Sequence, residues 1–266
     1  MKSQKEISLD KKILSMLSGR ALAAAEIILA DTEIQHIQEY ANTVSIKRLG
    51  YNDHGPVHMR TVAINSLIMI DLLHDAGIKL NLEDEEAGTF EDSKIAVLLA
   101  GFLHDIGMSV GRENHEHHGA MLAGPILERV LTDIYKDTPE KKIIIKSLVM
   151  ECISGHMATQ KIHSLEAGLI LIADGCDMKK GRARIPMIVH PESKVGDIHK
   201  YSSSAIESVS IEKGEKRPIK IVIEMSESVG FFQVEEVLIR KINSSPVKSH
   251  IELYAGVIGQ DVKRYL

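Results

Sequence analysis

Cysteine is scarce in this sequence, and its basic residues form no long run. Cys152 and Cys176 are the only two among 266 residues, and their positions match no zinc-finger spacing. Such usage predicts two reduced core thiols in a cytoplasmic protein. Lys and Arg number 32 against 37 Asp and Glu, which gives a formal net charge of −5. A polynucleotide is therefore not expected as the main partner, since binding one requires concentrated positive charge.

Long apolar runs are also absent. The N-terminus, MKSQKEISLDKK, carries charges where a secretory signal needs an apolar segment, and the later run ALAAAEIILA is too short to span a bilayer. No membrane association is expected, and the predicted location is the cytoplasm. Hydrophobic residues make up 44% and charged residues 26% of the chain, which is usual for a globular protein with a folded core.

Apolar residues recur at helical spacing from the start to about residue 178. Asp31 can cap a helix through IQHIQEYANTVSIKRL, and Pro56 suits the first turn of the next helix. The segment KIAVLLAGFLHDIG is apolar nearly all round, as expected for a central buried helix. The acidic stretch KLNLEDEEAGTFE predicts an exposed connection. Three further helices are predicted from Asn114 to about Val130, from Thr138 to about Ile153 and from Ser164 to about Met178.

The character of the sequence changes after Ile185. VSIEKG, IKIVIEMS and VKSHIELYAGVIG are typical of strands, and FFQVEEVLIRKIN has helical spacing. The predicted fold is mainly α, with a helical domain over residues 1–190 and a small α+β (ββαβ) domain over residues 200–266. Three strands leave exposed edges, so the second domain is predicted to form a homo-oligomer, with a ligand-binding regulatory role as the alternative.

Several of the 13 histidines lie in apolar surroundings or beside acids. His104 and Asp105 close the most apolar helix, where two adjacent ionisable groups are costly unless they are paired or bind an ion. A divalent metal would satisfy them, but it needs further nitrogen and oxygen ligands. The other candidates are His58 in a first helical turn, the cluster His115, His117 and His118, His156 after IIIKSLVMECISG, and Asp174 within LILIADGCD.

The order of these residues resembles that of HD-domain metal-dependent phosphohydrolases. The motifs read NDHGPVH, GFLHDIG, NHEHHGA, ISGH and LIADGCD, and the resemblance covers roughly residues 50 to 185. It implies an HD-type helical bundle with a dinuclear centre. The ligands that it implies for a first metal are His58, His104, Asp105 and Asp174. Asp105 would also bridge to a second metal, whose other implied ligands are His115 and His156.

Within the middle motif, the family places a histidine four residues before a glycine, which favours His115 ahead of Gly119. His118 lies on the same helix face and is the alternative ligand. Imidazole and carboxylate ligands without thiolate fit two divalent transition metal ions, namely Mn, Fe, Co or Zn, with Mg less favoured. A second dipeptide, His74-Asp75, is predicted to be unrelated to the centre.

Two further features bear on catalysis. His54, four residues before the first ligand, resembles the general acid of cyclic-nucleotide phosphodiesterases in this superfamily; the alternative is that His54 or Asp53 supports the start of the helix. The basic run DMKKGRARIP follows Asp174. It is either a solvated turn or a site for a substrate phosphate. The candidate phosphate-binding residues are Lys180, Arg182 and Arg184.

The resemblance implies hydrolysis of a phosphoester or phosphoanhydride bond by a metal-activated water. The expected substrate is a small phosphorylated molecule, such as a nucleotide, and the predicted catalytic residues are Asp105 and His54. Two alternatives stay open, a di-iron oxygenase of the same fold and a non-catalytic signalling HD module. The GYP-type motif is absent after His156, where the chain reads MATQKIHS, which disfavours cyclic di-GMP as the substrate.

Overall fold

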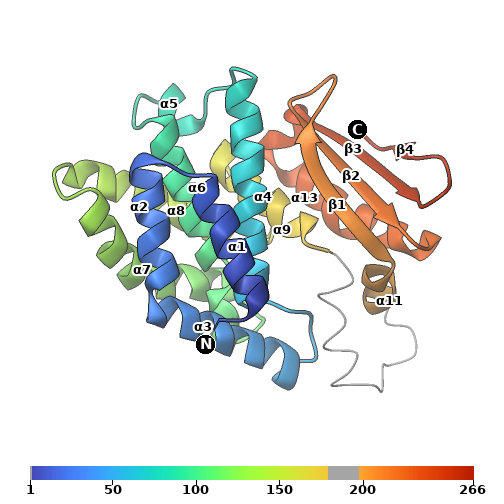
Figure 1. The fold of residues 1–266 in the computed structure, drawn as a ribbon, viewed down its shortest axis with the longest axis horizontal. Coiled ribbons are helices and arrows are strands. Elements are labelled where there is room, and N and C mark those ends of the chain that lie inside the picture. The colour runs from blue at the N-terminus through green and yellow to red at the C-terminus, as the bar shows by residue number, and fades with distance from the viewer. Residues whose placement is uncertain (1, 179–197) are drawn as a thin grey trace.

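The computed structural model describes residues 2–178 and 198–266. A bundle of helices forms most of the molecule, and a small twisted sheet from the C-terminal end packs against one side of it (Figure 1). The prediction of a mainly helical chain with a small sheet at its C-terminal end is therefore confirmed. Among the described residues, no helix has both the length and the apolar character that crossing a bilayer requires.

Several helices begin at the caps that the sequence predicts. Asp31 accepts hydrogen bonds from the backbone N–H groups of Glu33 and Ile34, and Pro56 occupies the first turn of the following long helix. The elements of the bundle are α1 (Gln4–Ser15), α2 (Gly19–Ala30), α3 (Thr32–Thr43), η1 (Val44–Arg48), α4 (Pro56–Asp75), α5 (Asn81–Asp84), α6 (Phe90–Leu103), η2 (Ile106–Ser109), α7 (His115–Ile134), α8 (Pro139–Gly155) and α9 (Leu165–Cys176).

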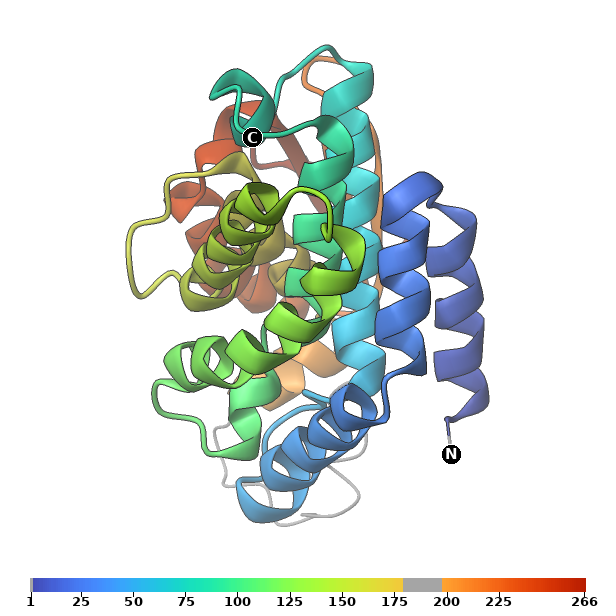
Figure 2. The ribbon, with the colours of Figure 1, turned by 90° about the vertical axis from the view of Figure 1, so that its left-hand side faces the viewer.

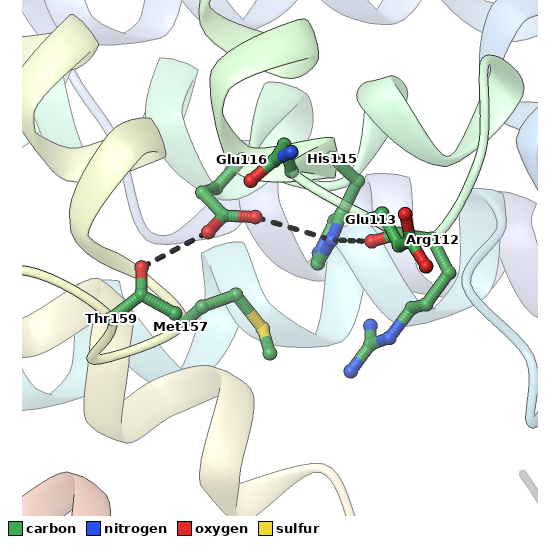
Figure 3. Close-up of a pocket in the computed structure, with 7 residues that line it drawn as sticks. Arg112, Glu113, His115, Glu116, Met157 and Thr159 are labelled. Atoms are coloured by element: carbon green, nitrogen blue, oxygen red, sulfur yellow. Dashed lines mark hydrogen bonds and ion pairs between the residues drawn. The ribbon is translucent and has the colours of Figure 1, made fainter.

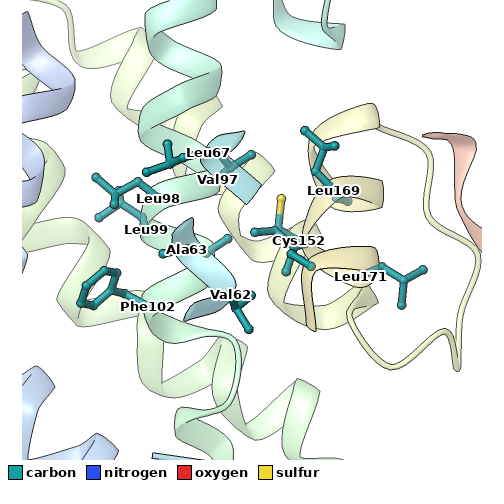
Figure 4. Packing of buried hydrophobic residues seen from close by; sticks show 14 of the residues in the cluster. Val62, Ala63, Leu67, Val97, Leu98, Leu99, Phe102, Cys152, Leu169 and Leu171 are labelled. Atoms are coloured by element: carbon teal, nitrogen blue, oxygen red, sulfur yellow. The ribbon is translucent and has the colours of Figure 1, made fainter. Parts of the chain in front are cut away.

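Helix α6 lies at the centre of the bundle, as its nearly uniform apolar sequence predicts. Every residue from Ile95 to Leu103 is buried, and α6 contacts α2, α4, α8 and α9. Figure 4 shows apolar side chains of α4 and α6 packed together, with Cys152 of α8 nearby. Both Cys152 and Cys176 are buried and unpaired, in agreement with the prediction of reduced core thiols. Figure 2 shows α1 and α2 side by side along one flank of α4 and α6.

The acidic stretch between α4 and α6 was predicted to be an exposed connection, and this was only partly right. It contains the short helix α5, and Leu80 and Leu82 beside it are buried. Each leucine contributes an apolar side chain to the core while the neighbouring acids stay at the surface. The acidic composition of the segment concealed these two anchoring residues.

The C-terminal sheet has four strands in the order β1-β2-β3-β4. Its strands are β1 (Ile206–Lys213), β2 (Ile219–Met225), β3 (Ile251–Val257) and β4 (Lys263–Arg264). β2 pairs antiparallel with β1 and parallel with β3, and β4 adds a two-residue antiparallel edge to β3. The predicted ββαβ order describes the first three strands and omits β4, which is too short to leave a periodic pattern. Self-association through the sheet edges stays a prediction.

A helical crossover joins the parallel strands β2 and β3, as a parallel connection requires. Its elements, together with the helix before β1, are α11 (Ile198–Ser204), η3 (Ser228–Gly230), α12 (Phe231–Gln233), η4 (Val234–Leu238), α13 (Ile239–Ser244) and η5 (Pro246–His250). The crossover packs on α9 through η4, α13 and η5, while β1 and β2 contact α4. The buried apolar residues of the sheet and the bundle form one continuous core.

The crossing of α4 and α6 depends on a glycine. A Cβ at Gly101 would lie 2.7 Å from the Cα of Ala63, closer than real Cβ atoms approach, and backbone cannot move aside as a flexible side chain can.

We expect Gly101→Ala to lower the free energy of unfolding by about 1–3 kcal/mol, the usual cost of overpacking, as measured by urea denaturation. The matched control is Gly124→Ala in α7, where no atom beyond its chain neighbours and the backbone of its own helix lies within 4 Å of the added methyl group. The gain of about 0.5–1 kcal/mol expected for replacing a helical glycine is opposed there by the following Pro125, so that change should alter stability less than Gly101→Ala does. Equal effects of the two substitutions would contradict the close packing described for Gly101.

Candidate metal centre

Six ionisable side chains from the ends of five helices meet at one place in the bundle. Asp105 lies at the junction of α6 and η2, directly after His104. The other four come from the first turns of α4 and α7, the residue after α8 and the last turn of α9. These residues are His58, His115, His156 and Asp174 respectively. Residues separated by as many as 116 positions are thus brought into one cluster.

The carboxylate of Asp105 divides this cluster into two halves. Its Oδ2 lies 3.2 Å from Nε2 of His58 and 3.4 Å from Nε2 of His104. Its Oδ1 lies 3.2 Å from Nε2 of His115 and 3.4 Å from Nε2 of His156. Each oxygen therefore faces its own pair of imidazoles. Two buried groups that could hold a metal ion result, and they share Asp105.

Asp174 adds a second carboxylate to the first half. Its Oδ1 lies 3.2 Å from Nε2 of His58 and 4.0 Å from Nε2 of His104. The first half thus offers two nitrogen and two oxygen atoms, and the second offers two nitrogens and one oxygen. Such mixed imidazole and carboxylate sets suit divalent transition metals.

Three of the imidazole rings are oriented by hydrogen bonds from Nδ1, the ring nitrogen that does not face Asp105. Nδ1 of His104 donates to the carbonyl oxygen of Gly101 at 3.0 Å, and Nδ1 of His156 donates to that of Ile153 at 2.6 Å. His115 forms the same bond with the residue three positions earlier, at 2.9 Å. A carbonyl oxygen only accepts, so the proton of each neutral ring is on Nδ1 and the lone pair is on Nε2. Metal-binding histidines are commonly held in this way.

These lone pairs face one another across distances that fit a bound cation. Nε2 of His58 lies 3.1 Å from Nε2 of His104, and the same distance separates Nε2 of His115 from Nε2 of His156. Two ligand atoms at about 2.1 Å from one ion and roughly 90–110° apart lie about 3.0–3.4 Å from each other. Since two lone pairs repel, a positive ion in each half would stabilise the arrangement. The donor set therefore fits metal ions.

The charge states of the cluster also favour metal binding. Burial alone would raise the pKa of Asp105, but the neighbouring His104 and His54 imidazoles hold that pKa well below its usual range. Burial likewise opposes ionisation of Asp174, and the ammonium of Lys241 outweighs it, so the pKa of that carboxyl is also well below normal. Burial lowers the pKa of His156 to about 4. The carboxylates are thus ionised and His156 is neutral at pH 7, which are the forms that bind metals.

Two glycines let η2 approach the start of α7. A Cβ at Gly107 would lie 1.9 Å from the carbonyl oxygen of His115 and 2.5 Å from the backbone nitrogen of Gly119. Only a residue without a side chain fits there. The close contact brings Asp105, two residues before Gly107, against the first residue of α7.

The structure brings His115 into the cluster and leaves His118 outside it. His115 is buried, whereas His118 is half-buried one turn later, and its Nδ1 has no hydrogen-bond partner among the described residues. The dipeptide His74-Asp75 is exposed at the opposite end of α4, where the His74 ring stacks on Phe90 at 3.8 Å. The second His-Asp dipeptide is thus far from the centre.

His54 lies beside the centre without joining either group. Its ring centroid is 5.8 Å from that of His58, and its Nδ1 contacts the carbonyl oxygen of Asn52 at 2.6 Å and the hydroxyl of Ser45 at 2.9 Å. Asp53 accepts a bond from the N–H of Gly55, just before α4 begins. The candidate phosphate-binding residues Lys180, Arg182 and Arg184 lie outside the described residues.

An open pocket adjoins the second half of the cluster. Figure 3 shows His115 at its edge, with Arg112 on one side and Met157 and Thr159 on the other. The carboxylate of Glu116 accepts a bond from the hydroxyl of Thr159 at 3.0 Å and lies 3.4 Å from Nδ1 of His115. His115 thus belongs both to the lining of this pocket and to the second half of the cluster.

No family model matches this chain, and no solved structure matches it. It is 37% identical over 249 residues to the Uncharacterized protein MJ1020 of Methanocaldococcus jannaschii, an alignment that covers 94% of each protein. The chain belongs to the family of this archaeal protein. The name of that relative states no activity. The chemistry of the cluster is therefore the basis for inferring a function.

Two partners of the cluster were not predicted from the sequence. Asp177 accepts a bond from Nδ1 of His58 at 2.7 Å, and Lys241 contacts both Asp174 and the carbonyl oxygen of His156. Asp177 lies three residues after Asp174, so the second acid of the segment LIADGCD was an available signal. Lys241, 67 residues beyond Asp174, has no distinguishing feature in its local sequence.

His115 and His118 provide a matched pair of substitutions for the second half. We expect His115→Ala to bind one equivalent of Mn²⁺ fewer than the wild type, because His115 supplies one of the two imidazoles that the described residues place there. His118→Ala should bind as many equivalents as the wild type. Metal content after dialysis, measured by elemental analysis, checks both. Loss of metal from His118→Ala with retention in His115→Ala would reverse the assignment.

Proposed function

We propose that this protein is a metal-dependent phosphohydrolase of the HD type, with a dinuclear centre in which Asp105 would be a ligand shared by both metal ions. The observation that carries the proposal is the division of the Asp105 oxygens between two histidine pairs, at 3.2 and 3.4 Å in each half. A mononuclear site would need only one of these halves. The order of the six residues, which resembles that of HD-domain enzymes, gives independent support.

Divalent ions in the two halves would supply Lewis acidity both for the attacking water and for a phosphoryl oxygen. The chain itself supplies the fixed frame for this chemistry. Asp105 and Asp174 provide negative charge, and the four imidazoles are held by their Nδ1 bonds, so little reorganisation is needed when a substrate binds. The burial of these side chains strengthens each of these electrostatic interactions.

A small phosphorylated substrate fits the surroundings of the centre. The open pocket beside His115 includes Arg112, whose guanidinium suits a phosphate and lies 5.9 Å from the centre of the Tyr51 ring. Tyr51 is substantially exposed and offers an aromatic surface on which a base could stack. We therefore propose a nucleotide or a related molecule as the substrate class.

Activity and metal binding should disappear together when Asp105 is replaced. We expect the wild type, supplied with Mn²⁺, to release phosphate or a phosphomonoester from members of a nucleotide panel, and Asp105→Ala to show neither hydrolysis nor retained metal. Asp75→Ala, in the exposed dipeptide, is the matched control and should behave as the wild type. Iron-dependent dioxygen uptake without hydrolysis would instead support the oxygenase alternative. Full activity of Asp105→Ala would place the reaction elsewhere.

His54 is the proposed proton donor to the leaving group. With an alkyl leaving group, His54→Gln should lower kcat by about 10²–10⁴-fold, the usual contribution of a general acid. With 4-nitrophenolate, which leaves without protonation, kcat should change little. Metal content and the urea midpoint serve as controls. Equal losses on the two substrates, together with lower stability, would show that His54 only supports the start of α4.

A further inference from the structure

The crossover in the C-terminal part of the chain reaches the metal centre. Lys241 of α13 extends its side chain to Asp174, with Nζ donating to Oδ2, and also donates to the carbonyl oxygen of His156 at 2.8 Å. Its side chain is only 12% exposed. An ammonium is rarely buried to this extent unless it is paired, and here its partners belong to both halves of the centre.

Helix α9, which carries Asp174, is shaped to receive the crossover. A Cβ at Gly175 would lie 3.0 Å from both Cδ1 of Leu238 and Cδ of Lys241. A Cβ at Gly168 would lie 2.6 Å from the hydroxyl oxygen of Ser245. The two glycines are seven residues apart and hence on the same face of the helix, two turns from each other. The missing side chain at Gly175 allows the Lys241 stem to lie directly against the helix beside Asp174.

The two oxygens of Asp174 have different partners. Oδ1 faces the first half of the centre, 3.2 Å from Nε2 of His58, whereas Oδ2 is bonded to Lys241. A carboxylate side chain can rotate about its bonds, and Asp174 retains some exposure to solvent. The bond from Lys241 restricts that rotation and leaves Oδ1 directed at the imidazoles. Outer partners of this kind orient metal ligands.

We propose that Lys241 is a positioning residue of the metal centre, so that the C-terminal part of the chain completes the site instead of forming a separate appendage. This inference rests on the proposed metal centre and not on which reaction the centre catalyses. Lys241 orients Asp174 through Oδ2 and ties the end of α8 to the same point through the carbonyl oxygen of His156.

The positive charge of Lys241 and its orienting bond to Asp174 have opposite effects on the affinity of the centre for metal ions. A positive charge close to the centre repels a metal ion, so charge alone predicts that removal of Lys241 would strengthen metal binding. Loss of the orienting bond predicts weaker binding, by about 10–100-fold for a typical outer partner of a ligand. The sign of the change in affinity therefore separates the two effects.

The test is a calorimetric titration of the metal-free full-length protein with Mn²⁺. We expect two equivalents in the wild type, and in Lys241→Met a loss of about 10-fold or more in affinity for one of them. Arg240→Met is the matched control, because Arg240 is adjacent on the same helix and its side chain is 71% exposed. It should bind as the wild type does. Unchanged or tighter binding of both equivalents by Lys241→Met would overturn the proposal.

A second variant keeps the proposal testable if Lys241→Met does not fold. Gly175→Ala retains every polar group but crowds the Lys241 stem, whose Cδ would lie 3.0 Å from the added Cβ and must shift, so it should also weaken one Mn²⁺ equivalent. Unchanged affinity in this variant would count against the proposal. The result is independent of hydrolysis: a wild type that binds Mn²⁺ without hydrolysing phosphates refutes the proposed activity alone, while one that binds no divalent metal refutes the centre itself.

Discussion

Four imidazole nitrogens converge on the carboxylate of Asp105, and this convergence is the constraint on which the rest of the structure depends. Burying ionisable groups together is costly, and each buried polar group that finds no partner costs about 1–3 kcal/mol. A whole domain is stable by only about 5–15 kcal/mol. A cluster with this cost is not a neutral by-product of packing. The surrounding helices must therefore hold together a group of buried ionisable side chains that could hold metal ions.

The ends of helices hold two of these imidazoles in position. The last carbonyl groups of a helix have no partner within the helix, and the imidazoles of His104 and His156 donate to carbonyl groups of this kind. The same bond that satisfies the helix end also turns Nε2 of the ring toward Asp105. Glycines at the contact of η2 with α7 then allow the backbone segments to approach closely enough for the second half to form. Local helix chemistry and the centre thus support each other.

Much of this could be predicted from the sequence, because helical spacing and caps are local properties. The central helix α6 and the start of α4 at Pro56 follow from patterns within single segments, whereas the set of six cluster residues came from the order of separated motifs that resembles HD-domain enzymes. His115 and His118 could not be separated on physical grounds, since residues three apart share a helix face. The deciding contact is between Gly107 and the start of α7, which the sequence does not encode as a pattern. Lys241 was not predicted because its contact with Asp174 likewise leaves no local pattern in the sequence. The strand β4 was not predicted because two residues are too few to show one.

The contact between Lys241 and Asp174 also has a consequence for the order in which the protein is made. A chain leaves the ribosome from its N-terminus, and segments fold in roughly that order. All six cluster residues precede residue 175, so they are synthesised before the lysine that bonds Asp174 exists. A nascent chain can therefore gather the imidazoles and carboxylates early, but the bond that Lys241 donates to Asp174 can form only after residue 241 has been synthesised and has left the ribosome.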